Sequence, residues 1–360
     1  MQKFSNKTAI ISGVGGQDGF YLTHYLLGLG YRVIGVSRRT STPNDLRLKI
    51  LRSSPNLHLV HGDVTDLSSI QNIVRLFQPD EFYNLAAQSH VALSWEYPIT
   101  TSEITGLGVL NCLEAIRKEK PDCRFYQAGS SEQFGNSGFE RQDIPLSIPR
   151  LGIESDGRVA YFLNEDSVMR PESPYAVAKN YAYNMTQVYR RSFDMFTSCG
   201  ILFNHESPVR GEEFVTRKIT RGLARVRWGL QPHVELGNMD ACRDWGFAKD
   251  YVRGMHAMLQ QDTPDDFVIA TGETHSVRSF FEKCCGHFEL DVNDVYKVNP
   301  KFMRPKDVEA LLGDSSKAKK VLGWEPECTF DELVRKMCDY DYHLQSPDAE
   351  LRRRSDEYLF

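Results

Sequence analysis

Tyr175 and Lys179 are four positions apart, the spacing that brings two side chains onto one face of a helix. An ammonium group beside a phenol favours the tyrosinate, so the pair predicts a tyrosine that removes a hydroxyl proton near neutral pH. Ser130 follows the strand-like run Arg124–Ala128, and its hydroxyl is suited to bind the same substrate oxygen. The alternative for Ser130 is a hydroxyl that only satisfies a strand end.

Glu132 adds a carboxylate two residues beyond that serine. Oxidation or epimerisation of a hydroxyl-bearing carbon needs only the hydroxyl, the tyrosine and the lysine. Elimination of water next to the new ketone also needs a base for the neighbouring C–H proton, and Glu132 fits that role. The alternative is a glutamate that forms a salt bridge or caps a helix.

A glycine-rich turn lies between the strand-like run Thr8–Ser12 and a helical pattern. Its glycines allow a tight turn and a close approach of the backbone to a pyrophosphate, which the following helix N-terminus favours. The predicted dinucleotide contacts in this turn are Gly13, Gly16, Gln17, Asp18 and Gly19.

The end of the second strand decides which dinucleotide is expected. Arg38 and Arg39 stand there instead of the acidic residue typical of NAD sites, and they suit a 2′-phosphate, so NADP is predicted. The alternative is two solvated arginines. Further cofactor contacts are expected at the ends of the third and fourth strands, from Asp63, Val64, Leu85, Ala86 and Ala87.

Strand-like and helix-like segments alternate through the first half of the chain, which predicts an α/β fold with a Rossmann-type doubly wound parallel sheet. We assign residues 1–205 to the dinucleotide-binding domain, with 243–272 returning to it. A smaller, mixed C-terminal substrate domain would hold 206–242 and 273–360. Helices are predicted over Leu311–Leu322 and Thr329–Cys338, and the tail from Arg352 onward is predicted to be an exposed end.

Charge, cysteine content and histidine spacing argue against several classes of function. The 360 residues carry a net charge of −5 without a basic block, which argues against nucleic-acid binding or a membrane surface. The eight cysteines show no CxxC pair and indicate reduced thiols in a cytoplasmic protein. Histidine spacing gives no reason to expect a catalytic metal.

The chain resembles the GDP-mannose 4,6-dehydratase family of the extended short-chain dehydrogenase/reductase superfamily. Stretches that carry the resemblance include GVGGQDGFYL, VSRRTST, NLAAQSHVALSWE, QAGSSEQFG, SPYAVAKNYAY, FNHESPVRGEEFVTRKITR and GNMDACRDWGFAKDYV. The resemblance implies a lyase that oxidises C4 of GDP-mannose, eliminates water across C5 and C6, and returns hydride to C6, giving GDP-4-keto-6-deoxymannose. It also implies NADP and a homotetramer in which the loop Arg38–Arg47 reaches a neighbouring subunit.

The resemblance also assigns residues. Ser130, Glu132, Tyr175 and Lys179 match the catalytic positions. Ser89, Lys179, His205 and Arg210 join the cofactor contacts named above. The positions that match contacts to the GDP-sugar are Ser89, Asn204, Thr216, Lys218, Arg243, Arg304 and Glu309.

Three departures from the family pattern stand out: Thr100 replaces a tyrosine, Val209 replaces an arginine, and 43 positions separate Glu132 from Tyr175 where roughly twenty are usual. The insertion between them, Asn136–Glu172, contains apolar residues, so we expect it to be ordered and packed on the body. It would form a lid that shapes substrate access, or else a surface elaboration or subunit contact.

Alternative functions stay open at this point. The enzyme could act on a related GDP-sugar such as GDP-manno-heptose, or be a C4 oxidase or epimerase. A non-catalytic NADP-binding scaffold is less favoured because it would not need Ser130, Glu132, Tyr175 and Lys179 together. For assembly, the alternatives to a tetramer are a dimer and a loop that closes only over its own cofactor.

Overall fold

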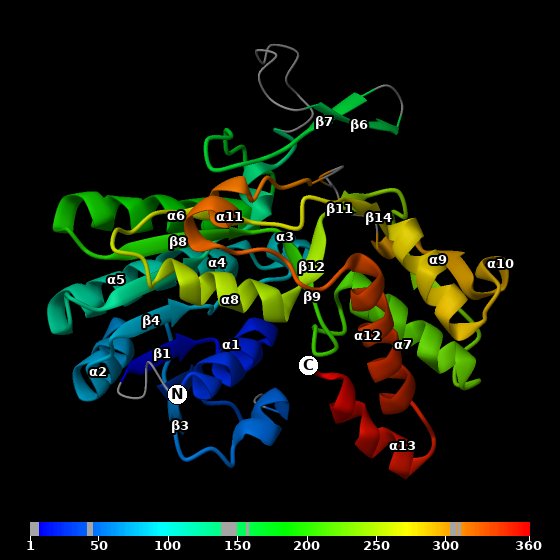
Figure 1. Ribbon diagram of the computed structural model, residues 1–360, viewed down its shortest axis with the longest axis horizontal. Helices are drawn as coiled ribbons and strands as arrows, with labels where there is room; N and C mark the ends of the chain where they lie inside the picture. The colour runs from blue at the N-terminus through cyan, green and yellow to red at the C-terminus, as the bar shows by residue number, and fades with distance from the viewer. Residues whose placement is uncertain (1–6, 42–45, 138–149, 156–157, 303–307, 309–310) are drawn as a thin grey trace.

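A computed structural model of the 360-residue chain describes residues 7–41, 46–137, 150–155, 158–302, 308 and 311–360, with the backbone alone for 46, 150–155 and 158–161. Figure 1 shows a central sheet with helices on both of its faces and a helical C-terminal part beside it. In the described ranges, no helix combines the length and apolarity needed to cross a bilayer.

The sheet has seven parallel strands in the order β13-β8-β5-β4-β1-β2-β3. Two of them, β1 and β5, have the limits expected from the sequence, because each is a short, mostly apolar run that ends at a polar residue or a glycine. The strands are β1 (Thr8–Ser12), β2 (Arg32–Ser37), β3 (Leu57–His61), β4 (Glu81–Asn84), β5 (Arg124–Ala128), β8 (Thr197–Leu202) and β13 (Phe267–Ile269).

Alternate residues of the strands enter two cores on opposite faces of the sheet, which confirms the predicted doubly wound fold. Ile11 joins Leu22 of α1 and Tyr251 of α8 in one core. Ile10 joins Ile70 of α2 and Leu113 of α5 in the other. The covering helices are α1 (Gln17–Gly28), α8 (Ala248–Met258), α2 (Leu67–Phe77), α5 (Gly108–Glu119) and α6 (Pro174–Phe193).

The part of the chain after β8 is mixed, with small sheets between helices. The strand β9 (Asn204–Glu206) pairs in parallel with β12 (Trp245–Phe247), and β11 (Cys242–Arg243) pairs with β14 (His275–Ser276). The remaining elements of this part are α7 (Val215–Arg227), β10 (Val234–Leu236), α9 (Val277–Phe288), α10 (Val292–Val295), β15 (Tyr296–Val298), η4 (Pro300–Phe302), α11 (Ser316–Leu322), α12 (Phe330–Leu344), α13 (Ala349–Arg353) and η5 (Arg354–Tyr358).

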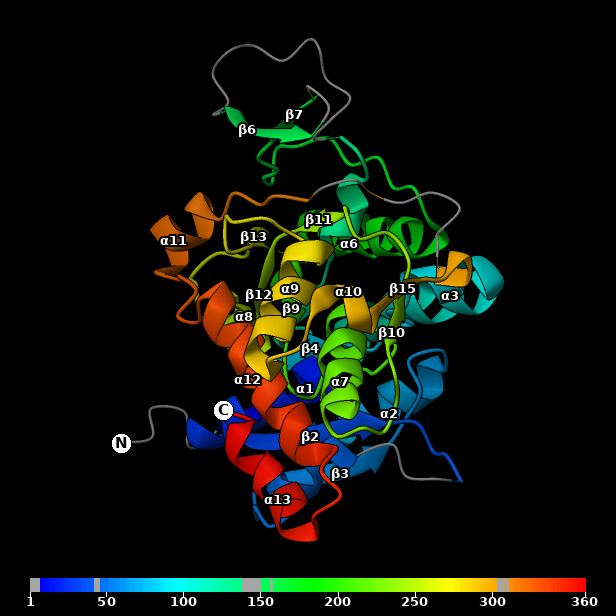
Figure 2. The ribbon, with the colours of Figure 1, turned by 90° about the vertical axis from the view of Figure 1, so that its right-hand side faces the viewer.

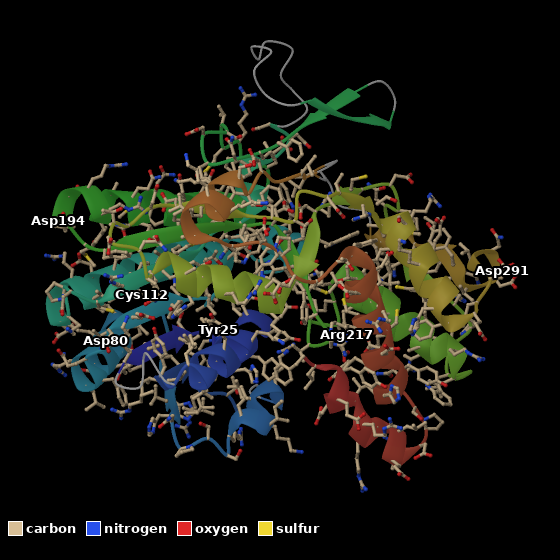
Figure 3. All side chains as sticks on the ribbon, in the orientation of Figure 1. Tyr25, Asp80, Cys112, Asp194, Arg217 and Asp291 are labelled. Carbon is tan, nitrogen blue, oxygen red and sulfur yellow. The ribbon has the colours of Figure 1, made fainter. Side chains whose placement is uncertain are left out.

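A buried ion pair joins two of these helices. Arg217 of α7, labelled in Figure 3, donates to Asp341 of α12 over 2.8 Å, and Thr220 bonds the same carboxylate. Arg217 also donates to the carbonyl of Arg210. Breaking such a pair leaves an uncompensated buried charge, so it fixes α7 and the loop before it.

Two sequence predictions for the C-terminal part are wrong in part. The helix predicted over Leu311–Leu322 begins only at Ser316, because Gly313 forms a strand-like bridge with Leu163 instead. The tail is exposed over Arg352–Arg354, as predicted, but its last residues are not. Leu359 is buried and its carbonyl accepts from Tyr21 of α1, while the Phe360 ring stacks on His24 at 4.1 Å.

The insertion Asn136–Glu172 contains an antiparallel hairpin of β6 (Arg150–Ser155) and β7 (Arg158–Tyr161). The hairpin stands outside the body in both ribbon views (Figures 1 and 2), so the prediction that the insertion packs on the body is wrong for this portion. Leu163, just beyond β7, is buried. Of the apolar residues on which this prediction rested, Ile144, Leu146 and Ile148 lie outside the described residues.

Candidate active site

The ends of β1, β4 and β5 lie side by side because these strands are neighbours in a parallel sheet. Gly13, Leu85 and Gly129 follow the three strands directly. Ligands of such sheets bind outside the carboxyl ends of the strands. The topology therefore brings the glycine turn and the catalytic segment, which are far apart in the sequence, to one edge.

The glycine turn has no room for side chains. Gly13 has a φ of +69°, and a Cβ on it would lie 2.8 Å from the backbone nitrogen of Ala86. A Cβ on Gly19 would lie 2.6 Å from the carbonyl oxygen of Gly13. Gly16 is the N-cap of α1 and offers no side-chain cap. The first N–H groups of the helix are thus left for a ligand, as a pyrophosphate requires.

Gln17 and Asp18 connect this turn to β9. The amide of Gln17 donates to the carbonyl of His205 over 3.0 Å and accepts from the hydroxyl of Ser207 over 2.7 Å. Asp18 faces Nε2 of His205 at 2.9 Å. Gln17 and Asp18, both predicted cofactor contacts, therefore bond a third one, His205. These bonds fix the glycine turn to β9.

Asp18 and His205 form a charged pair. Nδ1 of His205 lies 2.7 Å from the carbonyl of Phe203, so both ring nitrogens face acceptors and the ring carries both protons. Burial opposes both charges, but the attraction between them dominates. It helps to lower the pKa of Asp18 to about 2 and raises the pKa of His205. Tyr251 stacks on the imidazole at 4.5 Å.

The residues predicted to choose the cofactor lie at the same edge. Arg38 and Arg39 follow Ser37, the last residue of β2, and both are exposed. Asp63 accepts from the backbone N–H of Thr65, and Val64 is buried. Both arginines therefore stay accessible to an anion such as a 2′-phosphate.

The segment after β4 runs past the glycine turn, as the contact between Gly13 and Ala86 shows. Leu85, Ala86 and Ala87 are half-buried, whereas Ser89 is exposed. Arg210 packs its guanidinium over Phe214 at 3.7 Å and pairs with Glu206 at 3.2 Å. Together with the glycine cradle, these residues fit a dinucleotide.

The four predicted catalytic residues are all buried: Ser130 is 8% exposed, Glu132 9%, Tyr175 8% and Lys179 4%. Ser130 caps the short helix η3 (Ser131–Phe134), where its hydroxyl accepts from the N–H of Glu132 over 3.3 Å. Tyr175 and Lys179 lie in the first turns of α6, which Ser173 caps. Lys179 donates to the carbonyl of Ala128, the last residue of β5, over 2.7 Å.

The charges around Tyr175 differ from the sequence prediction. Burial raises the pKa of Tyr175 to about 12, although hydrogen bonding to Ser130 opposes the shift. Burial also lowers the pKa of Lys179 to about 8. The lysine ammonium lies 5.8 Å from the centre of the tyrosine ring. For Tyr175, the effect of burial therefore outweighs that of the hydrogen bond to Ser130.

The predicted substrate contacts other than Ser89 lie in β9 or later in the chain. Asn204 has a buried side-chain oxygen that bonds no other described residue, so it is available to a ligand. Thr216 donates to the carboxylate of Glu206. Arg243 is 7% exposed on β11. Arg304 and Glu309 lie outside the described residues.

A hollow of about 190 Å³ lies between α7 and β10. Lys218, a predicted substrate contact, lines it together with Arg221, Arg225 and His233, and the carboxylates of Glu212 and Glu235 lie at the same hollow. Arg221 is paired with Glu212 there, and His233 with Glu235.

Sequence reasoning missed two residues at this edge. Arg47, the end of the loop predicted to reach a neighbouring subunit, donates to the carbonyls of Gly15 and Val209 in its own chain over 3.0 and 2.8 Å. Gln133 accepts from the N–H of Ser130 over 2.8 Å. The pattern S-x-x-Q of a capping box, present at Ser130–Gln133, could have revealed it. Within the described ranges, no three His, Cys, Asp or Glu residues are grouped to hold a metal ion.

Comparison with known proteins identifies the family. A family model described as GDP-mannose 4,6 dehydratase matches residues 10–147 and 156–337. The chain belongs to the GDP-mannose 4,6-dehydratase family. It is 44% identical to GDP-mannose 4,6 dehydratase 2 of Arabidopsis thaliana, over 96% of this chain and 89% of the plant protein. It is also 44% identical to GDP-mannose 4,6-dehydratase of Vibrio cholerae, over 96% of each.

Solved structures agree on the fold of this dehydratase. UDP-glucuronic acid 4-epimerase from Bacillus cereus, solved with UDP-glucuronic acid and NAD, has a TM-score of 0.78 at 19% identity, over 94% of this chain and 99% of that one. dTDP-glucose 4,6-dehydratase from Bacillus anthracis, solved with NAD, has a TM-score of 0.76 at 18% identity, over 92% and 95%. The chain is therefore an enzyme of the short-chain dehydrogenase/reductase superfamily, and by family a hydro-lyase.

Proposed function

We propose that this enzyme converts GDP-mannose to GDP-4-keto-6-deoxymannose with a tightly held NADP, and that Ser130, Glu132, Tyr175 and Lys179 carry out the proton transfers. The observation that carries the proposal is the buried carboxylate of Glu132, two residues beyond the serine and close enough to Tyr175 to influence its pKa. An oxidation alone would not require a buried carboxylate at this place.

The residues act on three atoms of the sugar. Tyr175 takes the proton of the C4 hydroxyl, while Ser130 hydrogen-bonds the same oxygen. The C4 ketone acidifies the C5 proton, which Glu132 removes. Glu132 then returns that proton to the C6 hydroxyl, which leaves as water. Once C6 has regained a hydride, C5 takes up a proton from water, and Tyr175 releases the C4 hydroxyl proton, so that no proton is gained or lost overall. When bound, the nicotinamide dinucleotide supplies the redox chemistry, since it takes a hydride from C4 and returns it to C6.

Lys179 has two roles near Tyr175: it places a positive charge close to the phenol, and it holds α6 in position. With a pKa of about 8, its ammonium is charged at neutral pH and favours loss of the phenol proton. Its hydrogen bond to Ala128 fixes α6 against the end of β5, so that Tyr175 and Ser130 keep their relative position.

NADP is the proposed cofactor because Arg38 and Arg39 are exposed at the end of β2, where a 2′-phosphate would bind. Gly13 to Gly19 would hold the pyrophosphate. A solved relative in fold, the protein RMD from Pseudomonas aeruginosa in complex with NADPH, has a TM-score of 0.73 at 20% identity, over 95% of this chain and all of that one.

The GDP group is proposed to occupy the region between Asn204, Arg243 and the hollow lined by Lys218. Arginine and lysine suit a diphosphate, and the unpartnered oxygen of Asn204 offers an acceptor to a ligand hydroxyl or amide. Arg304 and Glu309 would complete this site.

Mass spectrometry of the reaction mixture tests the proposal. The purified enzyme, incubated with GDP-mannose, should produce a nucleotide sugar lighter by one water, without added NADP if the cofactor is retained. An unchanged GDP-mannose mass, with the same enzyme dehydrating another GDP-sugar, would assign a different substrate. A product oxidised at C4 without loss of water would remove dehydration altogether.

We also propose that the enzyme assembles as a homotetramer in the cytoplasm. Seven large apolar side chains on α3 (Val91–Glu96), α4 (Pro98–Thr101), η2 (Ser102–Leu107) and α6 are 37% to 73% exposed: Trp95, Tyr97, Ile99, Leu107, Val177, Tyr181 and Val188. Exposed large apolar side chains on neighbouring elements are typical of subunit interfaces. All eight cysteines are free thiols, which supports a reducing compartment.

A further inference from the structure

The family match is interrupted within the insertion: it breaks off at residue 147 and resumes at 156. The interruption covers β6 but not residues 162–172, which follow the hairpin and lead to α6. We call residues 162–172 the base segment. Unlike the hairpin, the base segment is in contact with the body on two sides.

Its first side lies against the catalytic turn. The side-chain amide of Gln133 donates to the sulfur of Met169 over 3.4 Å, and Asn136 donates to Glu172 over 3.3 Å. Gly135 has a φ of +55°, and a Cβ there would lie only 2.1 Å from the carbonyl oxygen of Arg170. The base segment therefore touches the chain directly after Glu132.

Gln133 carries this contact to the catalytic residues. Its side chain is fully buried, and its two polar atoms face opposite ways. The oxygen accepts from the N–H of Ser130 over 2.8 Å, while the nitrogen reaches Met169. Glu132 lies between these two anchored points. A shift of Met169 would thus be transmitted to the turn that carries the catalytic carboxylate.

The second side of the base segment is fixed to the body. Leu163 exchanges backbone hydrogen bonds with Leu312 and Asp314, each of 2.9 Å. Glu165 accepts from the N–H of Val268 in β13 over 2.6 Å. Leu163 also packs in a small core with Phe134 of η3, and Met169 lies against that core. The catalytic turn therefore rests on side chains that the base segment supplies.

We propose that the base segment is a positioning element for Glu132, and that Met169 and Gln133 carry its effect. Ser130 needs less support, because the preceding Gly129 donates to Gly200 of the sheet over 2.8 Å. Any loosening therefore falls on Glu132 and slows the elimination of water rather than oxidation at C4. This inference rests on the proposed role of Glu132 in the reaction.

Met169→Ala tests the proposal, since it removes both the packing and the sulfur that Gln133 contacts. Steady-state turnover of GDP-mannose should fall by about tenfold or more, because a displaced catalytic group loses its alignment. The KM for GDP-mannose and the amount of retained NADP should stay unchanged. In a single turnover, reduced cofactor should accumulate, because C4 oxidation continues while elimination is slowed. The absorbance in the near ultraviolet should rise accordingly.

Conservative variants separate positioning from a loss of folding. Met169→Leu keeps the volume and should retain turnover within about twofold. Gln133→Leu keeps the size but loses the contact with Met169 and the bond from the N–H of Ser130. It should therefore slow C4 oxidation as well as elimination, and it should accumulate less reduced cofactor than Met169→Ala. Met185→Ala, at a half-buried methionine of α6 in a different core, is the matched control and should not cause accumulation.

Three results would overturn the proposal. Met169→Ala could keep its turnover, it could lose NADP together with turnover, or it could raise KM in proportion to the fall in turnover. The wild-type enzyme, assayed in parallel, shows whether GDP-mannose is dehydrated at all. If the wild type does not dehydrate GDP-mannose, the proposed function is wrong. If the wild type does so but the variants behave differently from the prediction, only the positioning role is wrong.

Discussion

Glu132 is the residue on which the proposed chemistry depends most directly. It is only 9% exposed, and it is held between Ser130 and Gln133 in a turn that both residues brace. A buried glutamate in a braced turn keeps one geometry, which a base that acts on a C–H bond needs.

Glu132→Gln keeps the size and removes the base. Dehydration of GDP-mannose should fall by roughly a hundredfold or more, as expected when a general base is lost. NADP retained after desalting should match the wild type, and reduced cofactor should accumulate with substrate. Glu103→Gln, at an exposed position of η2, is the control. Unimpaired water loss by Glu132→Gln would remove this residue from the mechanism.

The pair of His205 and Asp18 predicts a pH-dependent stability. Because the pKa of His205 is raised in the folded state, its contribution is complete below its ordinary pKa of 6.5 and is lost as pH rises through the raised value. Asp18 contributes above pH 3.8, on the order of 2 kcal/mol, and loses this as pH falls towards its folded pKa of about 2.

Urea unfolding of wild type and His205→Gln at pH 6 and pH 9 measures the histidine part. The difference in free energy of unfolding between the two proteins should be larger at pH 6 than at pH 9. Equal differences at both pH values would mean that His205 is not charged in the folded protein.

Sequence reasoning found residue types better than their electrostatic state. The positions of Tyr175 and Lys179 on one helix follow from their spacing, and the turn at Gly13 follows from the need for a backbone without side chains. The pKa of Tyr175 could not be read in the same way, because burial by distant segments sets it. The link from Gln133 to Met169 likewise depends on a contact across 36 positions.

At the scale of elements, short buried strands with continuous apolar runs were predicted well, and those with mixed composition were not. The strand β8 contains Thr197, Ser198 and Cys199, all buried, and offers no apolar run to predict it from. The missing helical turn before Ser316 has a similar cause. Leu312 and Asp314 bond Leu163 of the insertion, so a tertiary contact overrides the local helical pattern.

The packing of the tail against α1 predicts that Leu359 contributes to the stability of the protein. Leu359 is 3% exposed and lies in the same core as Phe20 and Leu22. Leu359→Ala should lower the free energy of unfolding by about 2–4 kcal/mol, the usual cost of truncating a buried leucine. Arg353→Ala, at an exposed position of α13, should change it by less than about 0.5 kcal/mol. Denaturant titration of both variants checks this, and equal effects would contradict the buried tail.

At the scale of the whole molecule, α3, α4, η2 and α6 carry the exposed apolar side chains proposed as a subunit interface. One of these elements, α6, is the helix that carries the catalytic tyrosine. Val177, Tyr181 and Val188 point away from Tyr175 and Lys179, since the first group is exposed and the second buried. A second copy bound to this face would therefore pack against the back of the catalytic helix without entering the site.

Charge placed on that face should prevent the assembly. Tyr181→Asp should lower the molar mass measured by light scattering, because an unpaired carboxylate cannot be buried in an apolar interface. Leu76→Asp, at a 74% exposed leucine of α2, is the matched control and should leave the mass unchanged. A monomeric wild type at micromolar concentration would reject the proposed tetramer and the dimer alike.

The return of the tail to α1 also sets an order of events during translation. The helix α1 emerges from the ribosome early, but Phe360 stacks on its His24 only after almost the whole of the remaining chain has been made. Until then, the surface that Leu359 and Phe360 cover stays open on the nascent protein. The edge of β8 likewise waits for β13, some sixty residues later. Both surfaces therefore become buried only when these late segments have been made.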